Sequence, residues 1–461
     1  MRAHPAGAMH GDGVSAHHPL GPPAEDLNAL DPRIWPLGTE RRDGVVHFGG
    51  VDVRDIDTAY GTPAFVCVEA DFRSRCRAYR DAFGADADIY YAGKAFLCRA
   101  VVNWVREEGL SLEIFTGGEL GIALATGFPA EQILMHGSNK SLDELTAAVA
   151  AGVGRIVVDS DMEIARLASV ADAAGITQKV YIRATVGVEA HTHEFIATAH
   201  EDQKFGFSIA SGAALEAARR IAMLPSLQLM GVHSHIGSQI FDTAGFEVAA
   251  HRVVELVAAI RDTLDLELPE LDLGGGIGIA YTSEDDPADV ATVAKQLRAI
   301  VERECASARL PVPRLAVEPG RAIAGPGTVT LYTVGTLKDV DGIRTYVSVD
   351  GGMSDNIRTA LYDADYTVTL ASRASDADPM LCRVVGKHCE SGDIVVRDAW
   401  LPADLAPGDL LAVAATGAYC RSMASNYNAV FKPPVVAVDD GSHRLVVRRE
   451  TLDDLLALDL G

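Results

Sequence analysis

Three residues with reactive or ring-binding side chains stand where predicted buried strands end, and each also has an ordinary structural interpretation. Lys94 directly follows such a strand. Partial desolvation there lowers the pKa of a lysine and leaves a neutral amine that can form a Schiff base, although most lysines are simply exposed. Glu318 could keep a proton on a ring nitrogen, or form a buried ion pair with Arg321. His235 could stack on a flat ring, or be a core histidine with satisfied hydrogen bonds.

A thiol flanked by carboxylates is a fourth candidate, in the motif Cys389-Glu390-Ser391-Gly392-Asp393. Nearby negative charge raises the pKa of a thiol, so Cys389 is a poor nucleophile and is better suited to donating a proton. The structural alternative is a small buried residue in a turn.

Glycines after another predicted strand could bind a phosphate group. Gly274, Gly275 and Gly276 follow residues 270–273, and glycine lets backbone N–H groups approach a phosphate closely. Ser238 and Tyr419 could add hydroxyl donors. A tight loop is an equally good interpretation of the glycines alone. The sequence lacks the GxxxxGK[ST] pattern, which disfavours a nucleotide phosphate.

The elements that carry these residues alternate between short apolar runs and amphipathic segments from about residue 63 to 320. Apolar residues recur at helical spacing in segments such as 141–151 and 245–263. Eight strand–helix units in about 250 residues predict a (β/α)8 TIM barrel, with a doubly wound open sheet as the alternative. The predicted strands are residues 89–92, 111–115, 132–136, 155–159, 179–184, 227–235, 270–273 and 314–318.

Polar or glycine residues end all eight predicted strands. In a TIM barrel these ends meet at one mouth, where active sites lie, so the sequence predicts a site there. The residues are Lys94, Thr116-Gly117-Gly118, His136-Gly137, Asp159, Arg183, His235-Ile236-Gly237-Ser238, Gly274-Gly275-Gly276 and Glu318-Pro319-Gly320-Arg321.

The pattern predicts three parts of the chain. Residues 63–322 form the barrel, residues 29–62 and 323–461 form an antiparallel β domain of sandwich-like or barrel-like form, and residues 1–28 form a disordered tail. The tail histidines His4, His10, His17 and His18 could alternatively bind a metal weakly. The β domain should contain a hairpin at 44–53 and strands at 328–334, 344–349, 366–370, 410–414 and 444–448.

Composition restricts the partners and the compartment. The chain has 461 residues, 48% of them hydrophobic, and a formal net charge of −24, so nucleic acid and anionic membrane surfaces are not expected to bind. No apolar run is long enough to span a membrane, and no signal peptide is recognisable. Seven scattered cysteines without CxxC spacing predict reduced thiols in a cytoplasmic protein, with neither a disulfide framework nor a metal site.

Taken together, the motifs resemble the diaminopimelate decarboxylases, which are barrel-type pyridoxal-phosphate enzymes with the alanine-racemase-like fold (fold type III). The resemblance covers roughly residues 30 to 456 and is nearest to the actinobacterial branch. It rests on Tyr91-Ala92-Gly93-Lys94-Ala95, Thr116-Gly117-Gly118-Glu119-Leu120, His136-Gly137-Ser138-Asn139-Lys140-Ser141, His233-Ser234-His235-Ile236-Gly237-Ser238-Gln239, Glu318-Pro319-Gly320-Arg321, Cys389-Glu390-Ser391-Gly392-Asp393 and Gly417-Ala418-Tyr419.

The resemblance implies a role for each cofactor residue. Lys94 would hold pyridoxal phosphate as a Schiff base, His235 would stack on its ring, and Glu318 would face the pyridine nitrogen. The phosphate would be surrounded by Ser238, Gly274, Gly275, Gly276 and Tyr419, with Glu318, Pro319, Gly320 and Arg321 along the other side of the cofactor.

It also implies the reaction and the substrate contacts. Meso-2,6-diaminopimelate would lose carbon dioxide to give L-lysine, the last step of lysine biosynthesis. Arg321, Arg358 and Tyr362 would bind its distal carboxylate, Glu390 its distal amine, and Cys389 would protonate the carbanion; Tyr419 would also line the substrate site. Because Cys389 and Glu390 reach the site from a partner subunit in the family, a homodimer is implied.

Three residues differ from the family pattern, and three other classes of protein share part of it. Gly93, Ser138 and Arg421 stand where the family commonly has alanine, asparagine and an aromatic residue. A decarboxylase of ornithine, arginine or lysine would not need Arg358 to bind a second carboxylate. An alanine-racemase-like enzyme would place arginine, not Glu318, against the ring nitrogen. A non-catalytic carrier of the cofactor would have no use for Cys389, Glu390 or Arg358.

Overall fold

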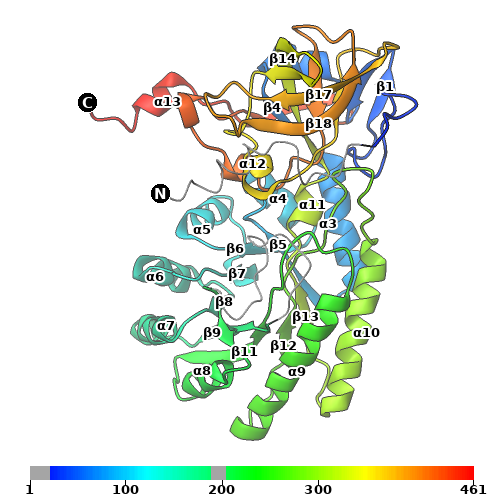
Figure 1. The fold of residues 1–461 in the computed structure, drawn as a ribbon. Helices are drawn as coiled ribbons and strands as arrows, with labels where there is room; N and C mark the ends of the chain where they lie inside the picture. Colours follow the sequence, from blue (N-terminus) through cyan, green and yellow to red (C-terminus); the bar gives the residue numbers. More distant parts are fainter. Residues whose placement is uncertain (1–20, 188–203) are drawn as a thin grey trace, which may run out of the picture. The chain divides into compact units, whose positions relative to one another are not determined.

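The computed structural model describes residues 21–187 and 204–461, which form two compact units (Figure 1). We call Arg73–Ile279 with Asp286–Ile323 the barrel unit. The described residues up to Phe72, together with Ala280–Asp285 and Ala324–Gly461, are the sheet unit. The tail histidines fall outside the described residues. Asn28 exchanges hydrogen bonds with the backbone of Ser375.

The barrel unit contains a closed ring of eight parallel strands, so the TIM-barrel prediction is confirmed and the open-sheet alternative is wrong. The strands pair in chain order, and β13 pairs with β5 to close the ring. Each lies within two residues of its predicted bounds. They are β5 (Ala87–Ala92), β6 (Ser111–Ile114), β7 (Ile133–Met135), β8 (Arg155–Val158), β9 (Gln178–Thr185), β11 (Leu227–His233), β12 (Glu270–Asp272) and β13 (Arg314–Val317), with a short extra strand β10 (Phe207–Ser208) beside β9.

Helices follow the strands and cover the outside of the ring (Figure 1). Local sequence fixes where several of them begin: Ser141 forms a capping box with Glu144 at the start of α6, and Thr116 caps α5. The helices are α3 (Glu69–Phe83), α4 (Arg99–Glu107), α5 (Gly117–Leu124), α6 (Leu142–Ala151), α7 (Asp161–Ala174), α8 (Ala213–Ala222), α9 (Ala244–Leu264), α10 (Val290–Ala308) and α11 (Arg321–Ala324), with a 3-10 turn η1 (Ala130–Gln132).

Large side chains fill the inside of the ring. Tyr90, Leu134, Val157, Tyr181 and Ala316 pack together from five different strands. The Tyr181 hydroxyl donates to Glu270 over 2.7 Å. Inward-facing residues of a TIM barrel normally make such a packed core rather than a pore, so reactive groups can lie only at an end of the ring.

The sheet unit has a mostly antiparallel sheet with two parallel strand pairings. One joins β15 (Arg344–Val349) to β17 (Pro379–Val385), and the other joins β4 (Ala64–Val68) to β20 (Val435–Asp439). A smaller sheet of β1 (Glu40–Arg42), β2 (Val45–Phe48) and β3 (Val51–Asp52) includes the predicted hairpin. The other elements are α2 (Val53–Tyr60), β4 (Ala64–Val68), β14 (Thr328–Val340), β15 (Arg344–Val349), α12 (Arg358–Tyr362), β16 (Val368–Leu370), β17 (Pro379–Val385), β18 (Ile394–Pro402), β19 (Leu410–Val413), η2 (Arg421–Met423), η3 (Tyr427–Ala429), β20 (Val435–Asp439), β21 (Ser442–Val447) and α13 (Leu452–Leu456).

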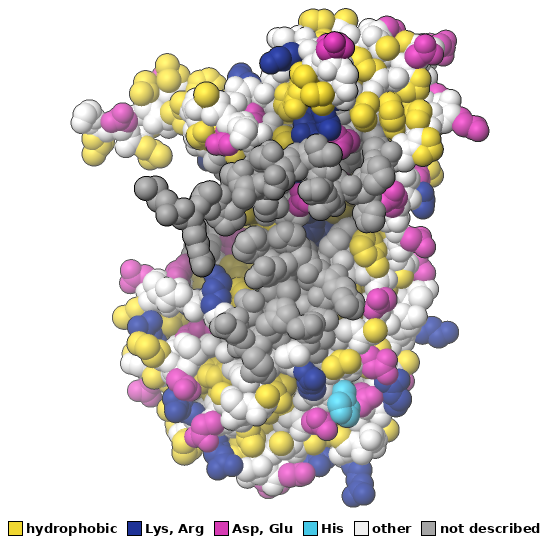
Figure 2. All heavy atoms as spheres, viewed as in Figure 1, with side chains coloured by type: hydrophobic (Ala, Val, Ile, Leu, Met, Phe, Trp, Pro, Cys, Tyr) yellow, Lys and Arg dark blue, Asp and Glu magenta, His cyan; other side chains and the backbone are white. Residues whose placement is uncertain are grey.

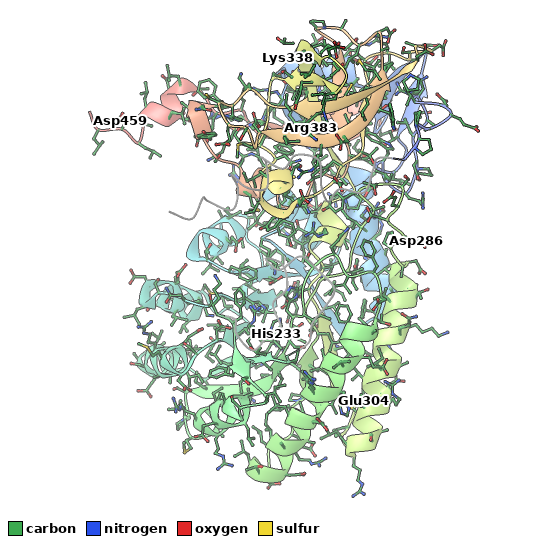
Figure 3. The ribbon with its side chains drawn as sticks, in the orientation of Figure 1. His233, Asp286, Glu304, Lys338, Arg383 and Asp459 are labelled. Atoms are coloured by element: carbon green, nitrogen blue, oxygen red, sulfur yellow. The ribbon has the colours of Figure 1, made fainter. Side chains whose placement is uncertain are left out.

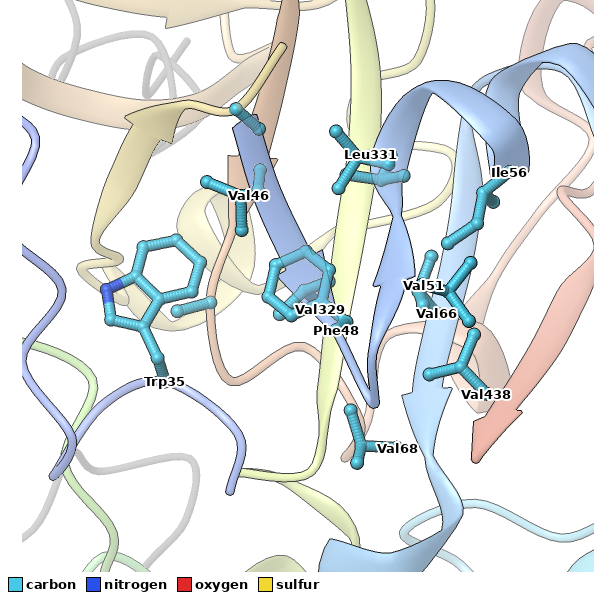
Figure 4. Packing of buried hydrophobic residues seen from close by; sticks show 14 of the residues in the cluster. Trp35, Val46, Phe48, Val51, Ile56, Val66, Val68, Val329, Leu331 and Val438 are labelled. Carbon is cyan, nitrogen blue, oxygen red and sulfur yellow. The ribbon is translucent and has the colours of Figure 1, made fainter. Parts of the chain in front are cut away.

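The core of the sheet unit joins its two sheets (Figure 4). Trp35 stacks on Phe48 of the small sheet with ring centroids 6.2 Å apart. Aliphatic residues of β4, β14 and β20, such as Val66 and Leu331, pack against them. Burying these side chains supplies the main stabilisation of such a unit.

Acidic and basic side chains are interspersed over the helices on the visible face of the barrel unit (Figure 2). No helix among the described residues is both long and apolar enough to cross a membrane. All seven cysteines are described and none is in a disulfide; six are buried and Cys389 is exposed.

Candidate active site

Lys94 lies at the mouth of the barrel, two residues after β5. Its Nζ is 3.3 Å from Oε1 of Glu113 and 4.4 Å from the centroid of the Phe115 ring, both contributed by the next strand and its end. About a third of the Lys94 side chain is exposed, whereas Glu113 is completely buried. The amine is therefore held in a defined place while part of the side chain stays accessible.

Glu318 directly follows β13 and is bound by two histidines. Nε2 of His136 lies 2.6 Å from one carboxylate oxygen, and Nε2 of His233 lies 3.3 Å from the other. All three side chains are buried, and Figure 3 shows His233 among the strands of the barrel unit. Each oxygen of the buried Glu318 carboxylate therefore has a histidine partner.

Burial and hydrogen bonding determine which groups of this cluster are charged. Burial lowers the pKa of His136 to about 3, and burial likewise lowers the pKa of His233. Burial alone would raise the pKa of Glu318, but the attraction and hydrogen bonds of the two histidines hold it well below its usual range. Neutral imidazoles donating to an ionised carboxylate satisfy all these directions.

The pKa values of two neighbouring carboxyl groups, Glu113 and Asp272, are raised and not lowered. Burial, reinforced by the charge of Glu318, raises the pKa of Glu113 to about 8 and raises that of Asp272 well above its usual range. One carboxyl oxygen of each has no hydrogen-bond partner among the described residues. Of these three carboxyl groups, Glu318 is therefore the one that is ionised at neutral pH, and Glu113 is protonated beside Lys94.

His235 and the glycine run are joined by a backbone hydrogen bond. The N–H of Gly275 donates to Nδ1 of His235 over 3.2 Å. Burial, followed by the charge of Lys94, lowers the pKa of His235 well below its usual value. The ring is thus neutral, with its proton on Nε2, and its orientation is fixed by the segment predicted to bind phosphate.

The three glycines are required by close backbone contacts. A Cβ on Gly275 would lie 2.2 Å from the carbonyl oxygen of Glu318, and one on Gly276 would lie 2.4 Å from that of Gly237. Gly274 and Gly276 also have positive φ angles of 68° and 121°. Residues with a Cβ could not adopt this backbone without a clash or strain, so the segment must be glycine.

A cation and a hydroxyl from the barrel unit complete this group. Arg321 donates to Oγ of Ser238 through Nε at 3.1 Å and through its terminal nitrogen at 2.8 Å. Gly320 lies so close to β5 that an added Cβ would be 2.9 Å from Cβ of Ala92, whose N–H donates to the carbonyl of Pro319. The Glu318–Arg321 segment is thereby fixed to the strand that precedes Lys94.

In the sheet unit, Arg358 is buried between two tyrosines. Its guanidinium carbon lies 4.8 Å from the Tyr281 ring centroid and 5.5 Å from that of Tyr366, and one terminal nitrogen donates to the Tyr366 hydroxyl over 2.5 Å. No carboxylate pairs with it among the described residues, and its Nε has no partner there. Tyr362 lies one turn away on α12, and is partly buried.

Cys389 and Glu390 lie on an exposed loop of the sheet unit that a buried carboxylate organises. Asp393 accepts hydrogen bonds from the N–H groups of Met353 at 2.6 Å and His388 at 2.7 Å. Because Cys389 itself is exposed, the structural alternative of a small buried residue in a turn is wrong. Tyr419, in the same unit, has a positive φ of 62°.

The structure brings together the predicted cofactor residues of the barrel unit: Lys94, His235, Ser238, Gly274, Gly275, Gly276, Glu318, Pro319, Gly320 and Arg321. Sequence reasoning gave no role to Glu113, Asp272, His136 or His233, although His136 was noted at a strand end. Three atoms of the types that bind metals, from His136, His233 and Glu318, lie within 4.8 Å of one another. The hydrogen bond from each histidine to Glu318 explains that proximity.

Comparison with known proteins places the chain in a family. Residues 69–325 match the family described as pyridoxal-dependent decarboxylase, pyridoxal binding domain. The diaminopimelate decarboxylase of Mycobacterium tuberculosis is 59% identical over 447 residues, covering 94% of this chain and 99% of the relative. That of Bacillus subtilis is 45% identical, covering 92% and 97%. A crystal structure of the M. jannaschii diaminopimelate decarboxylase with L-lysine superimposes with a TM-score of 0.86 at 29% identity, covering 92% and 98%.

The closed barrel, its lysine and its glycine run define the pyridoxal-binding class of decarboxylases with fold type III. Within that class, the chain belongs to the diaminopimelate decarboxylase family.

Proposed function

We propose that this protein decarboxylates meso-2,6-diaminopimelate to L-lysine and carbon dioxide with pyridoxal 5′-phosphate. The observation that carries the proposal is the pairing, in one barrel mouth, of the Lys94 amine with an ionised, doubly hydrogen-bonded Glu318. An amine that can form a Schiff base and an anion that can hold a ring proton are the two groups that this cofactor needs from a protein.

The surrounding residues fit the rest of the cofactor. Its phosphate needs donors and a backbone without side chains, which Gly274–Gly276, Ser238 and Arg321 provide. Its flat ring needs a planar partner, which the neutral imidazole of His235 provides. The barrel unit thus offers suitable residues for both the phosphate and the ring of pyridoxal phosphate.

When bound, pyridoxal phosphate withdraws the electrons left behind by departing carbon dioxide. The chain contributes charge and position to that step. Glu318 would hold the proton at the ring nitrogen. Glu113, protonated because burial raises its pKa to about 8, would hold a proton beside Lys94, whose Nζ lies 3.3 Å from Oε1 of Glu113. Glu318 and Glu113 are buried away from water, whereas the Lys94 side chain stays partly accessible.

We assign the substrate contacts to residues of the sheet unit together with Arg321. A buried guanidinium without a carboxylate partner needs an anion, and this supports binding of the distal carboxylate by Arg358 with Tyr362. Exposure of Cys389 and Glu390 supports their roles as proton donor and distal-amine ligand. Tyr419 is assigned to the phosphate and the substrate on the strength of its family motif.

The assembly and compartment are also proposals. We propose a homodimer in which Cys389 and Glu390 serve the partner's site, because both lie on an exposed loop. Seven cysteines without a disulfide favour a reducing cytoplasm.

The test is the release of carbon dioxide from meso-diaminopimelate, with ornithine, arginine and lysine assayed in parallel. We expect release from diaminopimelate at a much higher kcat/KM than from the other three. Release mainly from ornithine, arginine or lysine would retain the cofactor chemistry and contradict the role of Arg358. A protein that binds the cofactor and releases no carbon dioxide from any of them would be a carrier.

A further inference from the structure

His136, His233 and Glu318 come from the ends of three strands, β7, β11 and β13, that are not neighbours in the barrel. The imidazole rings lie edge to face with centroids 4.6 Å apart. The Phe115 ring stacks on His136 at 5.4 Å. This packing fixes both rings so that each presents Nε2 to a different oxygen of the same carboxylate.

The direction of these hydrogen bonds follows from burial. An imidazole removed from water stays neutral, with a proton on one nitrogen only. A carboxylate can only accept, so Nε2 must be the donor in both contacts. Glu318 therefore receives two N–H groups without a compensating positive charge on either ring.

The two other carboxyl groups of the cavity provide a contrast. Glu113 and Asp272 are as deeply buried as Glu318, but each has a carboxyl oxygen without a partner among the described residues. Three buried carboxyl groups so close together cannot all ionise. The group with a donor on each oxygen is the one that keeps the negative charge.

We propose that His136 and His233 are positioning residues that select Glu318 as the ionised carboxylate of the site and aim it at the cofactor's ring nitrogen. This inference rests on the proposed function, because it concerns the charge opposite that nitrogen. Of the nearby cations, Arg183 lowers the pKa of both histidines and Lys94 lowers that of His233, which helps to keep the imidazoles neutral.

The test is a titration of the apoprotein with pyridoxal phosphate across a range of pH, for wild type, H136L and H136Q. Loss of a hydrogen bond to a charged group costs roughly 1.5–3 kcal/mol, so we expect the dissociation constant of H136L to rise about tenfold or more near pH 7. In H136L, Glu318 takes up a proton more easily, so affinity relative to wild type should recover as pH rises. Glutamine can place a donor near the position of Nε2, and H136Q should stay near wild type.

H251L is the matched control, because His251 is an exposed imidazole on α9 that pairs with Glu304 and Glu255 away from the barrel mouth. It should leave cofactor affinity unchanged. Circular dichroism and thermal melting establish that each variant is folded. If H136L does not fold, H233L is measured instead, and the same direction with a smaller change is expected because its contact is longer.

The proposal is overturned if folded H136L, or H233L in its place, binds pyridoxal phosphate as tightly as wild type at every pH. Equal losses in H136L and H136Q would also overturn it, because the donor would then be irrelevant. A wild-type protein that does not bind pyridoxal phosphate would contradict the proposed function itself. The two failures are therefore distinguishable.

Discussion

Nζ of Lys94 lies 3.3 Å from a carboxyl oxygen of Glu113, whose side chain is completely buried. The second oxygen of Glu113 has no hydrogen-bond partner among the described residues. A buried carboxyl group with one unsatisfied oxygen favours its protonated form. The contact thus places an exchangeable proton beside the amine on which the chemistry depends.

The proton on Glu113 should affect how the free energy of unfolding of the apoprotein changes with pH. Because the pKa of Glu113 is raised to about 8 by burial, the folded protein binds a proton there that the unfolded chain loses above about pH 4.5. This contribution is complete at low pH and is lost as pH rises from about 4.5 to 8, by up to about 1.4 kcal/mol per pH unit. The stability of E113Q should therefore fall less with rising pH than that of wild type.

Thermal melting between pH 5 and pH 8 measures this difference. E131Q is the control, because Glu131 is exposed and should leave the wild-type pH dependence unchanged. Parallel pH profiles for wild type and E113Q would show that Glu113 is not protonated in the folded protein.

Arg358 should determine the preference for a diacid. Lysine in its place keeps the charge but loses the planar fork that stacks between Tyr281 and Tyr366 and binds a carboxylate through two nitrogens. We expect R358K to lower kcat/KM for diaminopimelate at least about tenfold, the order expected from losing one charge-assisted hydrogen bond. The weaker reaction with ornithine should change little.

The ratio of kcat/KM for the two substrates is the measurement, and R448K is the control because Arg448 is exposed and pairs with Asp454. A ratio that does not change in R358K would remove Arg358 from substrate recognition. Y366F should shift the ratio in the same direction as R358K, by a smaller amount, because it removes only the hydroxyl that holds the guanidinium.

The sequence predicted the barrel well because its strands are short, mostly apolar and followed by polar or glycine residues. In the sheet unit, β15 was found because its fully buried residues alternate with partly buried ones. The strands β4 and β20 were missed because they are buried along nearly their whole length, which removes alternation. The strands β17 and β18 were also missed; β17 begins with a proline, which is rarely found inside strands.

The candidate site was predictable only where residue type alone indicates chemistry. Lys94 and the glycines have such a signal. Glu113 lies inside a predicted strand, and its contact with Lys94 depends on which face of the strand turns inward. Tyr281 stands beside Arg358 although 77 positions of sequence separate them, because Ala280–Asp285 packs with the sheet unit. Tertiary packing creates that contact, and local sequence does not record it.

Asp393 should control the reactivity of Cys389. The D393A substitution leaves the N–H groups of Met353 and His388 without their acceptor, at a cost of roughly 1–3 kcal/mol for the buried N–H of His388. We expect a lower melting temperature and faster alkylation of Cys389 by a small thiol reagent. The reagent reports on this loop alone, because the other six cysteines are buried.

D376N is the control for this loop, because Asp376 is exposed elsewhere in the sheet unit. It should react at the wild-type rate. An alkylation rate in D393A equal to that of wild type would show that the carboxylate does not hold the loop in place.

Two alanine substitutions should separate a glycine that is required from one that is not. G275A would place a Cβ 2.2 Å from the carbonyl oxygen of Glu318, so we expect weaker cofactor binding and a loss of stability of about 1–3 kcal/mol or more. G121A, in the middle of α5, meets nothing within 4 Å and should be neutral or stabilising by about 0.5–1 kcal/mol. Unfolding and cofactor titration measure both, and equal effects would contradict the role of the glycine run.

The most direct test of the central claim is to locate the cofactor's attachment. The purified protein, loaded with pyridoxal phosphate, is reduced with borohydride and digested, and the modified peptide is identified by mass spectrometry. We predict one modified residue, Lys94, and no modification in K94A. Modification of a different lysine, or none in the wild-type protein, would contradict the assignment of Lys94 and the account of the site built around it.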